Sequence, residues 1–465
     1  MLKIYNTLTR KLENFKPIKE NEVRFFVCGV TPYDYSHLGH AKTYTQFDII
    51  VKYLRNKDFN VKYIQNVTDI DDKIIKKAKE QKIDWREISR KYEKEYLEDM
   101  KNLGNDSVNK YARATDYIKE IVSQVKRLIE KGYAYKISDG WYFDLSKDKE
   151  YGKLAKRTSL EGEDAVSRVD ENREKRNKGD FCLLKISKPG EPYWEVEIES
   201  KKFLVRPGWH IEDTAITEKE LGEQYDIHGG GIDLIFPHHE AEIAQMESIS
   251  GKKPFVRYWM HTGFVKVNKD KMSKSLDNFL TIKDVLKNYN KEVIRFLFLS
   301  THYRKPIDFN QDLLEQSKNT LQKLNEFMIC LENYKSEVKD NNKIDKLIDK
   351  TKKNFEKEMN NDFDTHNGIT VIFEFMKEVN KMMTEKSISN NDAKQAIKFM
   401  REIDKVFGIL EEKSEIPNNI KKLAEERQEA RKKKDFKTSD KIRDELKKSG
   451  YYVDDKEEWY VVKRL

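Results

Sequence analysis

The chain has 465 residues, of which 37% are charged and 37% hydrophobic, with 90 lysines and arginines against 82 acids. This length predicts roughly two to four domains with a substantial core. The longest apolar runs are short of the roughly 20 residues that a membrane span needs, and we expect no signal peptide before Tyr5. Three cysteines exclude a disulfide framework and favour a reducing cytoplasm. The small basic excess weakly favours a polyanionic partner.

Residues 25–40, FFVCGVTPYDYSHLGH, predict a buried strand, a tight turn and a helix start. β-branched and aromatic residues come first, turn and capping residues follow, and a periodic segment runs from Ala41 to Leu54. Ligands in open α/β folds bind at the carboxyl ends of strands and at helix N-termini. We therefore expect a ligand site here, beside one thiol and two imidazoles.

Strands and helices alternate over the first 300 residues, which predicts βαβ units and a parallel sheet. We expect a second strand at 60–66, a hairpin at 133–145 and one strand over 256–267. The charged stretch 161–178 is predicted to be a mobile surface excursion. From about 311 onward the pattern is helical, with a charged helix pair at 420–450 and a small hairpin at 451–465.

Two histidines open the predicted helix in the segment HLGH, His37 to His40. Residues three apart lie on one face of a helix, and Gly39 allows a ligand to approach the backbone. Such a pair can donate hydrogen bonds to phosphate oxygens in a transition state. Taken alone, the pair is more often structural than catalytic.

A second cationic segment, KMSKS, carries Lys271 and Lys274 in a predicted loop between a strand and a helix. Two lysines at this spacing suit a pyrophosphate leaving group. Taken alone, a solvated basic loop is the plainer interpretation.

Glycines 229 to 231 follow a short predicted strand, with His228 before them and Asp233 after them. They favour close approach of a nucleotide, whose ribose the acid would bind, although a structural turn is equally compatible. Further along, His238 and Glu242 are four apart on a helix predicted to open at Pro237, so both point the same way, while His239 is expected to point elsewhere.

A thiolate from Cys28 would supply a third zinc ligand beside His238 and Glu242. The alternative is a buried free cysteine and an unrelated surface His–Glu pair.

These segments together resemble one family. HLGH and KMSKS are similar to the two signatures of class I aminoacyl-tRNA synthetases. FFVCGVTPYDYSHLGHAKTY, NVTDIDDKIIKKA, RPGWHIE, DIHGGGIDLIFPHHEAEIAQ and KMSKSLDNF resemble cysteinyl-tRNA synthetases, in order and at the expected separations. MNNDFDTHNG and EERQEARKKKDFKTSDKIRDEL extend the resemblance over nearly the whole chain.

The resemblance implies a zinc ion that coordinates the substrate cysteine as a thiolate, at positions matching Cys28, His238 and Glu242. The fourth family position is a cysteine, and this chain has Asp213 there, in WHIED. An aspartate binds zinc, but a carboxylate in place of a thiolate weakens the preference for this metal. We expect one zinc per chain, held by Cys28, Asp213, His238 and Glu242.

The resemblance further implies a cysteine pocket lined by Trp209 and His228, which Gly29, Thr31 and Thr68 are expected to join. ATP would contact His37, Gly39 and His40 through its phosphates, and Gly229, Gly230, Gly231 and Asp233 through adenosine. Lys271 and Lys274 would stabilise the departing pyrophosphate, with Mg²⁺ accompanying ATP.

The implied fold is α/β, with a Rossmann-like doubly wound parallel sheet followed by an all-α bundle and a small C-terminal region. We expect a catalytic domain at 1–310 with a connective insertion around 115–205, a tRNA-binding bundle at 311–412, and a basic anticodon-region domain at 413–465. The implied activity is ATP-dependent ligation of L-cysteine to tRNA(Cys) through a cysteinyl adenylate, by a cytoplasmic monomer that has no membrane partner.

Two other functions fit parts of the chain. A cysteine:amine ligase would activate cysteine in the same way but transfer it to a sugar amine, and the segment TPYD, 31–34, is reminiscent of such enzymes. A non-catalytic RNA-binding paralogue is the third hypothesis, supported only by Asp213. The resemblance in 425–446 favours tRNA over the amine, and intact HLGH and KMSKS favour an enzyme.

Overall fold

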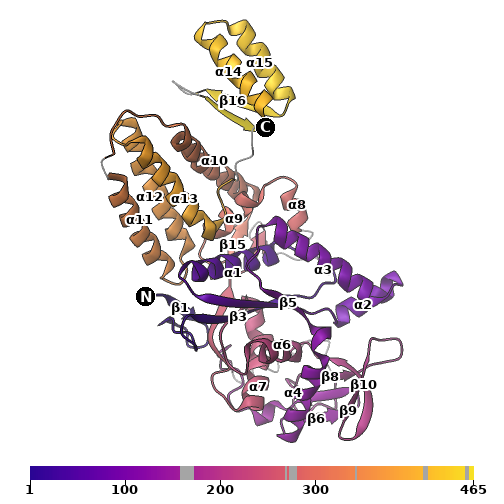
Figure 1. The fold of residues 1–465 in the computed structure, drawn as a ribbon. Coiled ribbons are helices and arrows are strands. Elements are labelled where there is room, and N and C mark those ends of the chain that lie inside the picture. The colour runs from indigo at the N-terminus through magenta and orange to yellow at the C-terminus, as the bar shows by residue number, and fades with distance from the viewer. Residues whose placement is uncertain are drawn as a thin grey trace.

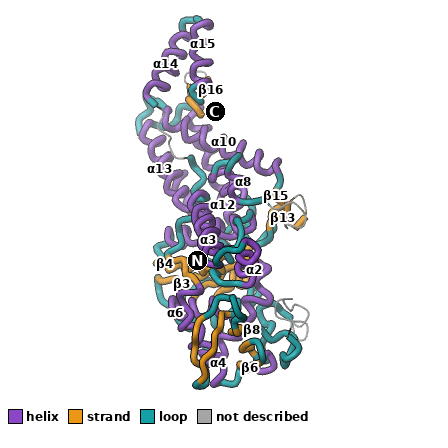
Figure 2. The backbone as a smooth tube through the Cα atoms, turned by 90° about the vertical axis from the view of Figure 1, so that its right-hand side faces the viewer, coloured by secondary structure: helices purple, strands orange, loops and turns teal. Residues whose placement is uncertain are grey.

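The computed structural model describes residues 1–157, 172–267, 270–271, 280–340, 343–411, 417–455 and 460–464. The molecule is elongated: a sheet-containing half carries a helical bundle, and a helix pair lies at the far end (Figures 1 and 2). Among the described residues, no helix combines the length and apolar character needed to cross a membrane.

The central sheet has five parallel strands in the order β12-β11-β3-β4-β5. Its strands are β3 (Glu22–Val30), β4 (Asn60–Val67), β5 (Lys110–Arg113), β11 (Tyr225–Gly231) and β12 (Val256–Thr262). Helices α1 (Leu38–Asn56), α2 (Asp72–Gln81), α3 (Trp85–Asn102), α6 (Ile211–Leu221) and α7 (Glu240–Ser250) connect or cover them. Both faces of β3 are buried, which explains its unbroken apolar run. The predicted doubly wound parallel sheet is confirmed.

The strand order reverses between β3 and β11. From β3 the chain proceeds to β4 and β5 on one side, and it later returns to place β11 and β12 on the other side. Loops leaving the carboxyl ends of two such strands diverge and leave a crevice, which is the usual ligand site of this architecture. Cys28 and His228 lie at this reversal, because His228 pairs in register with Phe26 on β3.

A second sheet, antiparallel where its strand pairs are described, is inserted between β5 and α6, in the order β6-β7-β8-β10-β9. Its strands are β6 (Ala134–Ile137), β7 (Gly140–Phe143), β8 (Cys182–Ile186), β9 (Trp194–Ile198) and β10 (Lys201–Pro207), with α4 (Ile118–Glu130) before them. The hairpin predicted at 133–145 is confirmed. Strand β10 was not expected. Residues 158–171, most of the excursion predicted at 161–178, lie outside the described residues.

The single strand predicted over 256–267 is wrong, because the chain breaks at Gly263 into β12 and β13 (Val265–Val267). A Cβ on Gly263 would lie 2.5 Å from the carbonyl carbon of Lys305, so the two backbones meet closely there. Strand β13 then pairs with β14 (Asp270–Lys271) and β15 (Ile307–Phe309). Helices α8 (Ile282–Leu286) and α9 (Lys291–Leu299) lie between β14 and β15.

The C-terminal part is helical, as predicted. The bundle comprises α10 (Gln311–Asn333), α11 (Lys343–Met359), α12 (Thr365–Thr384) and α13 (Asn390–Phe407). Beyond it lie α14 (Asn418–Lys432), α15 (Phe436–Lys448) and a hairpin of β16 (Tyr451–Asp455) and β17 (Tyr460–Arg464). A short hairpin of β1 (Lys3–Asn6) and β2 (Lys11–Asn14) at the other end of the chain packs on the sheet.

One buried arginine joins the bundle to the sheet-containing half. Arg295 on α9 donates to Asp48 Oδ2 on α1 at 3.0 Å and to the carbonyl of Phe407 at the end of α13 at 2.9 Å. It also donates to the carbonyl of Leu103 and to Asn105 Oδ1, between α3 and β5. A planar guanidinium suits such a junction, since its five donors point in fixed directions.

Arg295→Met is expected to destabilise the protein by about 3–5 kcal/mol, because Asp48 would remain buried without this partner. Urea unfolding measures the change, with Lys394→Met on the exposed face of α13 as the matched loss of one positive charge. Equal stability of the two variants would contradict the role given to Arg295.

Candidate active site at the reversal of strand order

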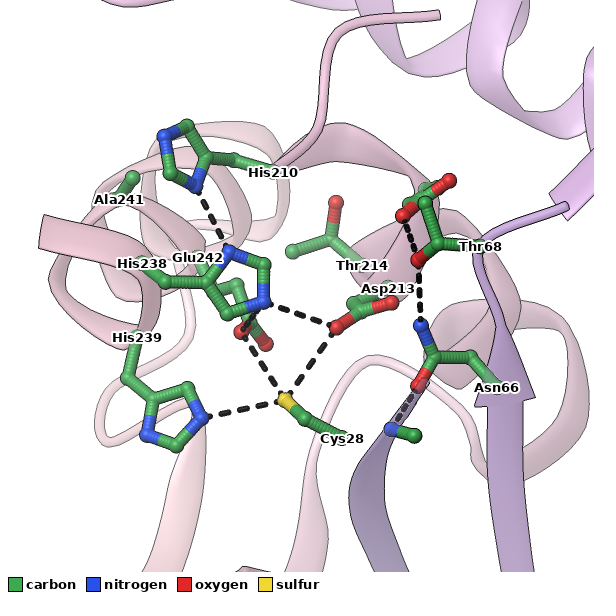
Figure 3. A network of polar contacts seen from close by, with 12 residues as sticks. Cys28, Asn66, Thr68, His210, Asp213, Thr214, His238, His239, Ala241 and Glu242 are labelled. Atoms are coloured by element: carbon green, nitrogen blue, oxygen red, sulfur yellow. Dashed lines mark hydrogen bonds and ion pairs between the residues drawn. The ribbon is translucent and has the colours of Figure 1, made fainter. Parts of the chain in front are cut away.

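The thiol of Cys28, near the end of β3, is the centre of a buried polar cluster (Figure 3). Its Sγ lies 3.3 Å from Asp213 Oδ2 on α6 and 3.8 Å from Glu242 Oε1 on α7. His238 Nε2 completes the group, at 3.0 Å from Asp213 Oδ2 and 3.2 Å from Glu242 Oε1. The structure therefore brings together the four residues expected to hold a metal, and their ligand atoms all lie within 4.8 Å of one another.

His210 contacts the ring of His238 on the side that faces away from Cys28 and the two carboxylates. The Nδ1 of His238 lies 2.8 Å from Nδ1 of His210, so one of the two rings donates to the other. Burial and the neighbouring His238 lower the pKa of His210, which keeps His210 neutral and able to accept. A His238 ring that donates through Nδ1 would present the Nε2 lone pair to the cluster, as a metal ligand must. The indole of Trp209 stacks on His238 at 4.3 Å.

The prediction that His239 points away from the cluster is wrong. Its Nε2 lies 3.1 Å from Cys28 Sγ, and its Nδ1 contacts His261 Nε2 at 2.8 Å. The regular helix begins only at Glu240, and a wider, irregular turn spans 235–239 before it. In this turn the two consecutive histidines reach Cys28 and its partners from different sides (Figure 3).

Cys28 is also shared with a second possible ligand set, which comprises Cys28, His228, His239 and Glu242. His228 meets Cys28 Sγ through Nε2 at 3.3 Å but faces Glu242 through Nδ1 at 3.6 Å. One nitrogen of this ring nevertheless lies within 4.8 Å of a ligand atom of each of the other three residues of the set. The Nδ1 of His228 is occupied by the hydroxyl of Tyr225 at 2.6 Å.

The cluster brings acidic groups together out of contact with water. Burial raises the pKa of the Cys28 thiol, and the nearby Asp213 adds to this. Burial and Asp213 likewise raise the pKa of Glu242. One oxygen of each carboxylate, Asp213 Oδ1 and Glu242 Oε2, finds no hydrogen-bond donor among the described residues. Such a donor set is typical of a site built for a cation.

The neighbouring wall of the crevice comes from β3 and β4. The amide of Gly29 donates to Asn66 Oδ1 at 2.5 Å, and Asn66 donates through Nδ2 to Thr68 Oγ1 at 3.3 Å. The hydroxyl of Thr68 donates in turn to Glu212, next to Asp213. A Cβ on Gly29 would lie 1.8 Å from the carbonyl oxygen of Asn66, so only glycine fits here. Thr31 follows in the turn, half-buried.

The two histidines of HLGH form one stacked unit at the start of α1, with ring centroids 3.8 Å apart. His37 caps the helix by accepting from the amide of Gly39 at its Nδ1, and His40 Nδ1 accepts from the amide of His37. Burial lowers the pKa of His40, so this ring is neutral at physiological pH. With Nδ1 accepting, each ring carries its proton on Nε2 and offers a donor.

The three glycines after His228 close the other side of the crevice. A Cβ on Gly229 would lie 2.4 Å from the ring of Phe47, and one on Gly230 would lie 2.8 Å from the ring of His239. The bare backbone therefore lies directly against the HLGH helix and the histidine cluster. Asp233, two residues on, is exposed.

The segment that carries KMSKS is attached to α1 on both sides. Before it, Lys42 donates to the carbonyl of Gly263 at 2.7 Å, and Thr43 bonds Thr262 at 2.8 Å. After it, the amide of Leu38 donates to the carbonyl of Leu280. Lys271 is placed on β14 by its backbone, whereas Lys274 lies outside the described residues.

Comparisons with known proteins agree with this arrangement. The family model for the tRNA synthetases class I (C) catalytic domain matches residues 14–319, and models of the DALR domain and the cysteinyl-tRNA ligase anticodon binding domain match 354–411 and 413–460. The chain belongs to the cysteinyl-tRNA synthetase family of class I synthetases. The cysteine–tRNA ligase of Thermoplasma volcanium is 48% identical and covers 97% of this chain and 98% of its own length. That of Thermococcus gammatolerans is 44% identical and covers 100% and 99%.

Solved structures show the same fold at low identity. Methionyl-tRNA synthetase of Mycobacterium tuberculosis, solved with methionyl-adenylate, superposes with a TM-score of 0.63 at 14% identity, over 83% of this chain and 92% of that one. A putative arginyl-tRNA synthetase of Campylobacter jejuni gives 0.57 at 13% identity, over 86% and 95%. These neighbours confirm the class I fold predicted from the motifs.

Sequence reasoning missed three residues of the site, namely His210, Glu212 and His261. Each of them contacts a residue named in the sequence analysis: His210 contacts His238, Glu212 accepts from Thr68, and His261 contacts His239. A signal existed for His210 and Glu212, since both stand in the WHIED segment between Trp209 and Asp213. For His261 there was none, because its partner His239 belongs to a different element of the chain.

Proposed function

We propose that the chain ligates L-cysteine to the 3′ end of tRNA(Cys) at the expense of ATP, through a cysteinyl adenylate. One observation carries the proposal: a buried cysteine-centred ligand set adjoins the HLGH helix start at the reversal of strand order. An amino acid bound at the first and ATP bound at the second would have their reacting groups side by side. Family membership over the whole chain supports the same activity.

Catalysis needs no protein nucleophile, because the cysteine carboxylate attacks the α-phosphorus itself. The chain contributes positioning and charge stabilisation. The Nε2 protons of His37 and His40 would donate to phosphate oxygens. Gly229, Gly230 and Gly231 would let adenosine lie against the backbone, with Asp233 at the ribose.

Lys271 and Lys274 would neutralise the departing pyrophosphate. The residues that flank their segment are attached to α1, the helix that begins at the histidines proposed to hold the phosphates. Mg²⁺ would accompany ATP and share that role.

The residues present fit a zinc ion held by Cys28, Asp213, His238 and Glu242. Zinc ligands at about 2.0–2.3 Å in a tetrahedron are about 3.3–3.6 Å from one another. The four measured separations, 3.0 to 3.8 Å, are close to this range. The two buried carboxylate oxygens without donors support a cation here. When bound, zinc supplies a soft acceptor that holds the substrate sulfur as a thiolate, which serine cannot match.

The chain's own side chains would complete the cysteine pocket. Gly29 on β3, Thr68 just after β4 and His228 within β11 would line it. The indole of Trp209, stacked on His238 and 40% exposed, would cover the substrate and exclude water. Thr31, in the turn after β3, would border the entrance.

The C-terminal half would bind the tRNA. Its helix pair is the most basic extended segment, with 12 lysines and arginines against 7 acids over residues 421–448. The match of 413–460 to an anticodon binding domain favours tRNA over an amine as the cysteine acceptor. Contacts of this kind weaken steeply with salt, because binding releases counterions. We propose that the enzyme acts as a cytoplasmic monomer.

Pyrophosphate exchange tests the activation step. We expect exchange that depends on cysteine and is not supported by serine, and we expect His40→Ala to lower it about 100-fold through lost transition-state stabilisation. Absence of exchange with cysteine would refute both ligase hypotheses. Charging of a tRNA(Cys) transcript then decides between tRNA and a sugar amine as acceptor.

Metal analysis tests the ligand set. We expect about one zinc per purified chain, lost in Cys28→Ala because a four-ligand site rarely survives loss of a ligand. Cys330→Ala, which removes a half-buried thiol in the bundle, should keep the metal. Metal-free protein that still prefers cysteine over serine would contradict the zinc account.

Asp213→Cys tests the departure from the family pattern. A second thiolate makes the site softer, so zinc should bind more tightly and leave more slowly to a chelator than in the unmodified chain. The comparison is a competition titration against a chromogenic chelator. Faster loss of zinc from Asp213→Cys would show that Asp213 is not a ligand.

A further inference from the structure

A cavity of about 220 Å³ lies between α3 and the inserted sheet, outside every residue assigned above. Its lining comprises Asp69, Trp85, Arg86, Ser89, Arg90, Thr115 and Trp194. Asp69 directly follows Thr68, so the cavity begins one residue along the chain from the wall of the cysteine pocket. Two parts of the chain line the cavity: one belongs to the half with the central parallel sheet, and the other belongs to the inserted antiparallel sheet.

Two half-buried indoles form its apolar wall. Trp85 on α3 and Trp194 on β9 meet edge to face, with ring centroids 6.2 Å apart at 66°. They pack on a small apolar floor made of Ile70, Ile75 and Ala114. The guanidinium of Arg86 lies over the ring of Trp85 at 4.7 Å. Flat aromatic surfaces capped by a guanidinium are what an unstacked nucleobase requires.

The polar groups of the cavity include one that is buried and unsatisfied. The Ser89 side chain is 2% exposed, and its hydroxyl has no hydrogen-bond partner among the described residues. Opposite, the buried carboxylate of Asp69 accepts from the amide of Thr115 at 2.9 Å and from its hydroxyl at 2.6 Å. Each carboxylate oxygen retains a second lone pair. The cavity therefore offers both a donor and acceptors to a polar base edge.

Ion pairs hold the two sides of the cavity together. Asp72 at the start of α2 pairs with Lys185 of β8 at 3.0 Å and with Arg206 of β10 at 2.6 Å. The insertion and the α2–α3 segment are thus fixed against each other close to the cavity. Arg86 and Arg90 lie at its exposed rim, where Arg90 also contacts Glu93 at 3.3 Å.

We propose that this cavity binds one unpaired nucleobase from the single-stranded 3′ end of the tRNA. The indoles would stack on the base, and Asp69 would accept from an exocyclic amino group, which adenine and cytosine carry and uracil lacks. The rim arginines would contact the adjoining phosphates. This assignment rests on the proposed function, because the cavity would be a binding site for part of the tRNA substrate of that reaction.

Binding of a stepwise shortened tRNA tests the assignment. A tRNA(Cys) transcript and versions lacking one, two or three 3′ nucleotides are titrated at fixed salt, without ATP or cysteine. In the unmodified chain, affinity should fall about 10-fold at the step that removes the seated base, since stacking on an aromatic side chain carries an effect of that order. In Trp194→Leu, removal of the same nucleotide should lower the affinity less than about 2-fold.

Three variants guard against a folding artefact. Trp194→Phe keeps an aromatic face and should again show the fall in affinity when the base is removed. Ser89→Met fills the cavity from its other wall and should abolish this fall. Tyr193→Leu removes the neighbouring aromatic residue, which is 60% exposed and does not line the cavity, and should behave as the unmodified chain.

Equal losses on shortening in the unmodified chain and in Trp194→Leu, or no loss in either, would overturn the assignment. Cysteine-dependent pyrophosphate exchange needs no tRNA and is measured on the same samples. Absence of this exchange in the unmodified chain would refute the proposed activity. If exchange is present but shortening the tRNA affects the unmodified chain and Trp194→Leu equally, only the assignment of the cavity is refuted.

Discussion

The structure depends on one electrostatic constraint at the reversal of strand order. A thiol and two carboxylates, from β3, α6 and α7, are buried together where burial penalises every negative charge. In an apolar interior such groups either take up protons or share a cation. The ring of His238, in contact with His210 on its far side, faces the same point through Nε2. The arrangement therefore supports the proposed metal site.

The parallel sheet brings these buried acidic groups beside the proposed nucleotide site. Cys28 lies near the end of β3, a few residues before the HLGH segment begins α1, and His228 lies on β11 directly before the three glycines that end this strand. Adjacent parallel strands end at the same edge of the sheet, so Cys28 and the HLGH segment meet His228 and the three glycines there. The close packing of Gly229 and Gly230 against Phe47 and His239 shows how little space separates the two halves of the site.

Much of this was predictable from local patterns. The strand, turn and helix at 25–40 follow from an apolar run with turn and capping residues, and the inserted hairpin follows from Asp139-Gly140. The behaviour of His239 did not follow, because helical periodicity was assumed from Pro237 while the regular helix begins at Glu240. The break at Gly263 also escaped prediction, since its cause is contact with a distant segment.

Features formed by distant segments were the hardest to foresee. Arg295 joins α1, the α3–β5 connection and α13, and no local pattern distinguishes it from a surface arginine. Trp85 and Trp194 lie far apart in the sequence, and neither belongs to a motif, so the cavity between them follows only from the fold. The local sequence thus predicts the proposed ligands and catalytic motifs, whereas tertiary packing determines how these residues are oriented and connected.

X-ray absorption at the zinc edge tests the central claim most directly, because it counts sulfur neighbours at about 2.3 Å. With Asp213 in place of the family cysteine, zinc in the free protein should have a single sulfur ligand, from Cys28. Addition of L-cysteine should raise the count to two, and L-serine should leave it unchanged. Two sulfurs without substrate, or no change on adding cysteine, would contradict the account.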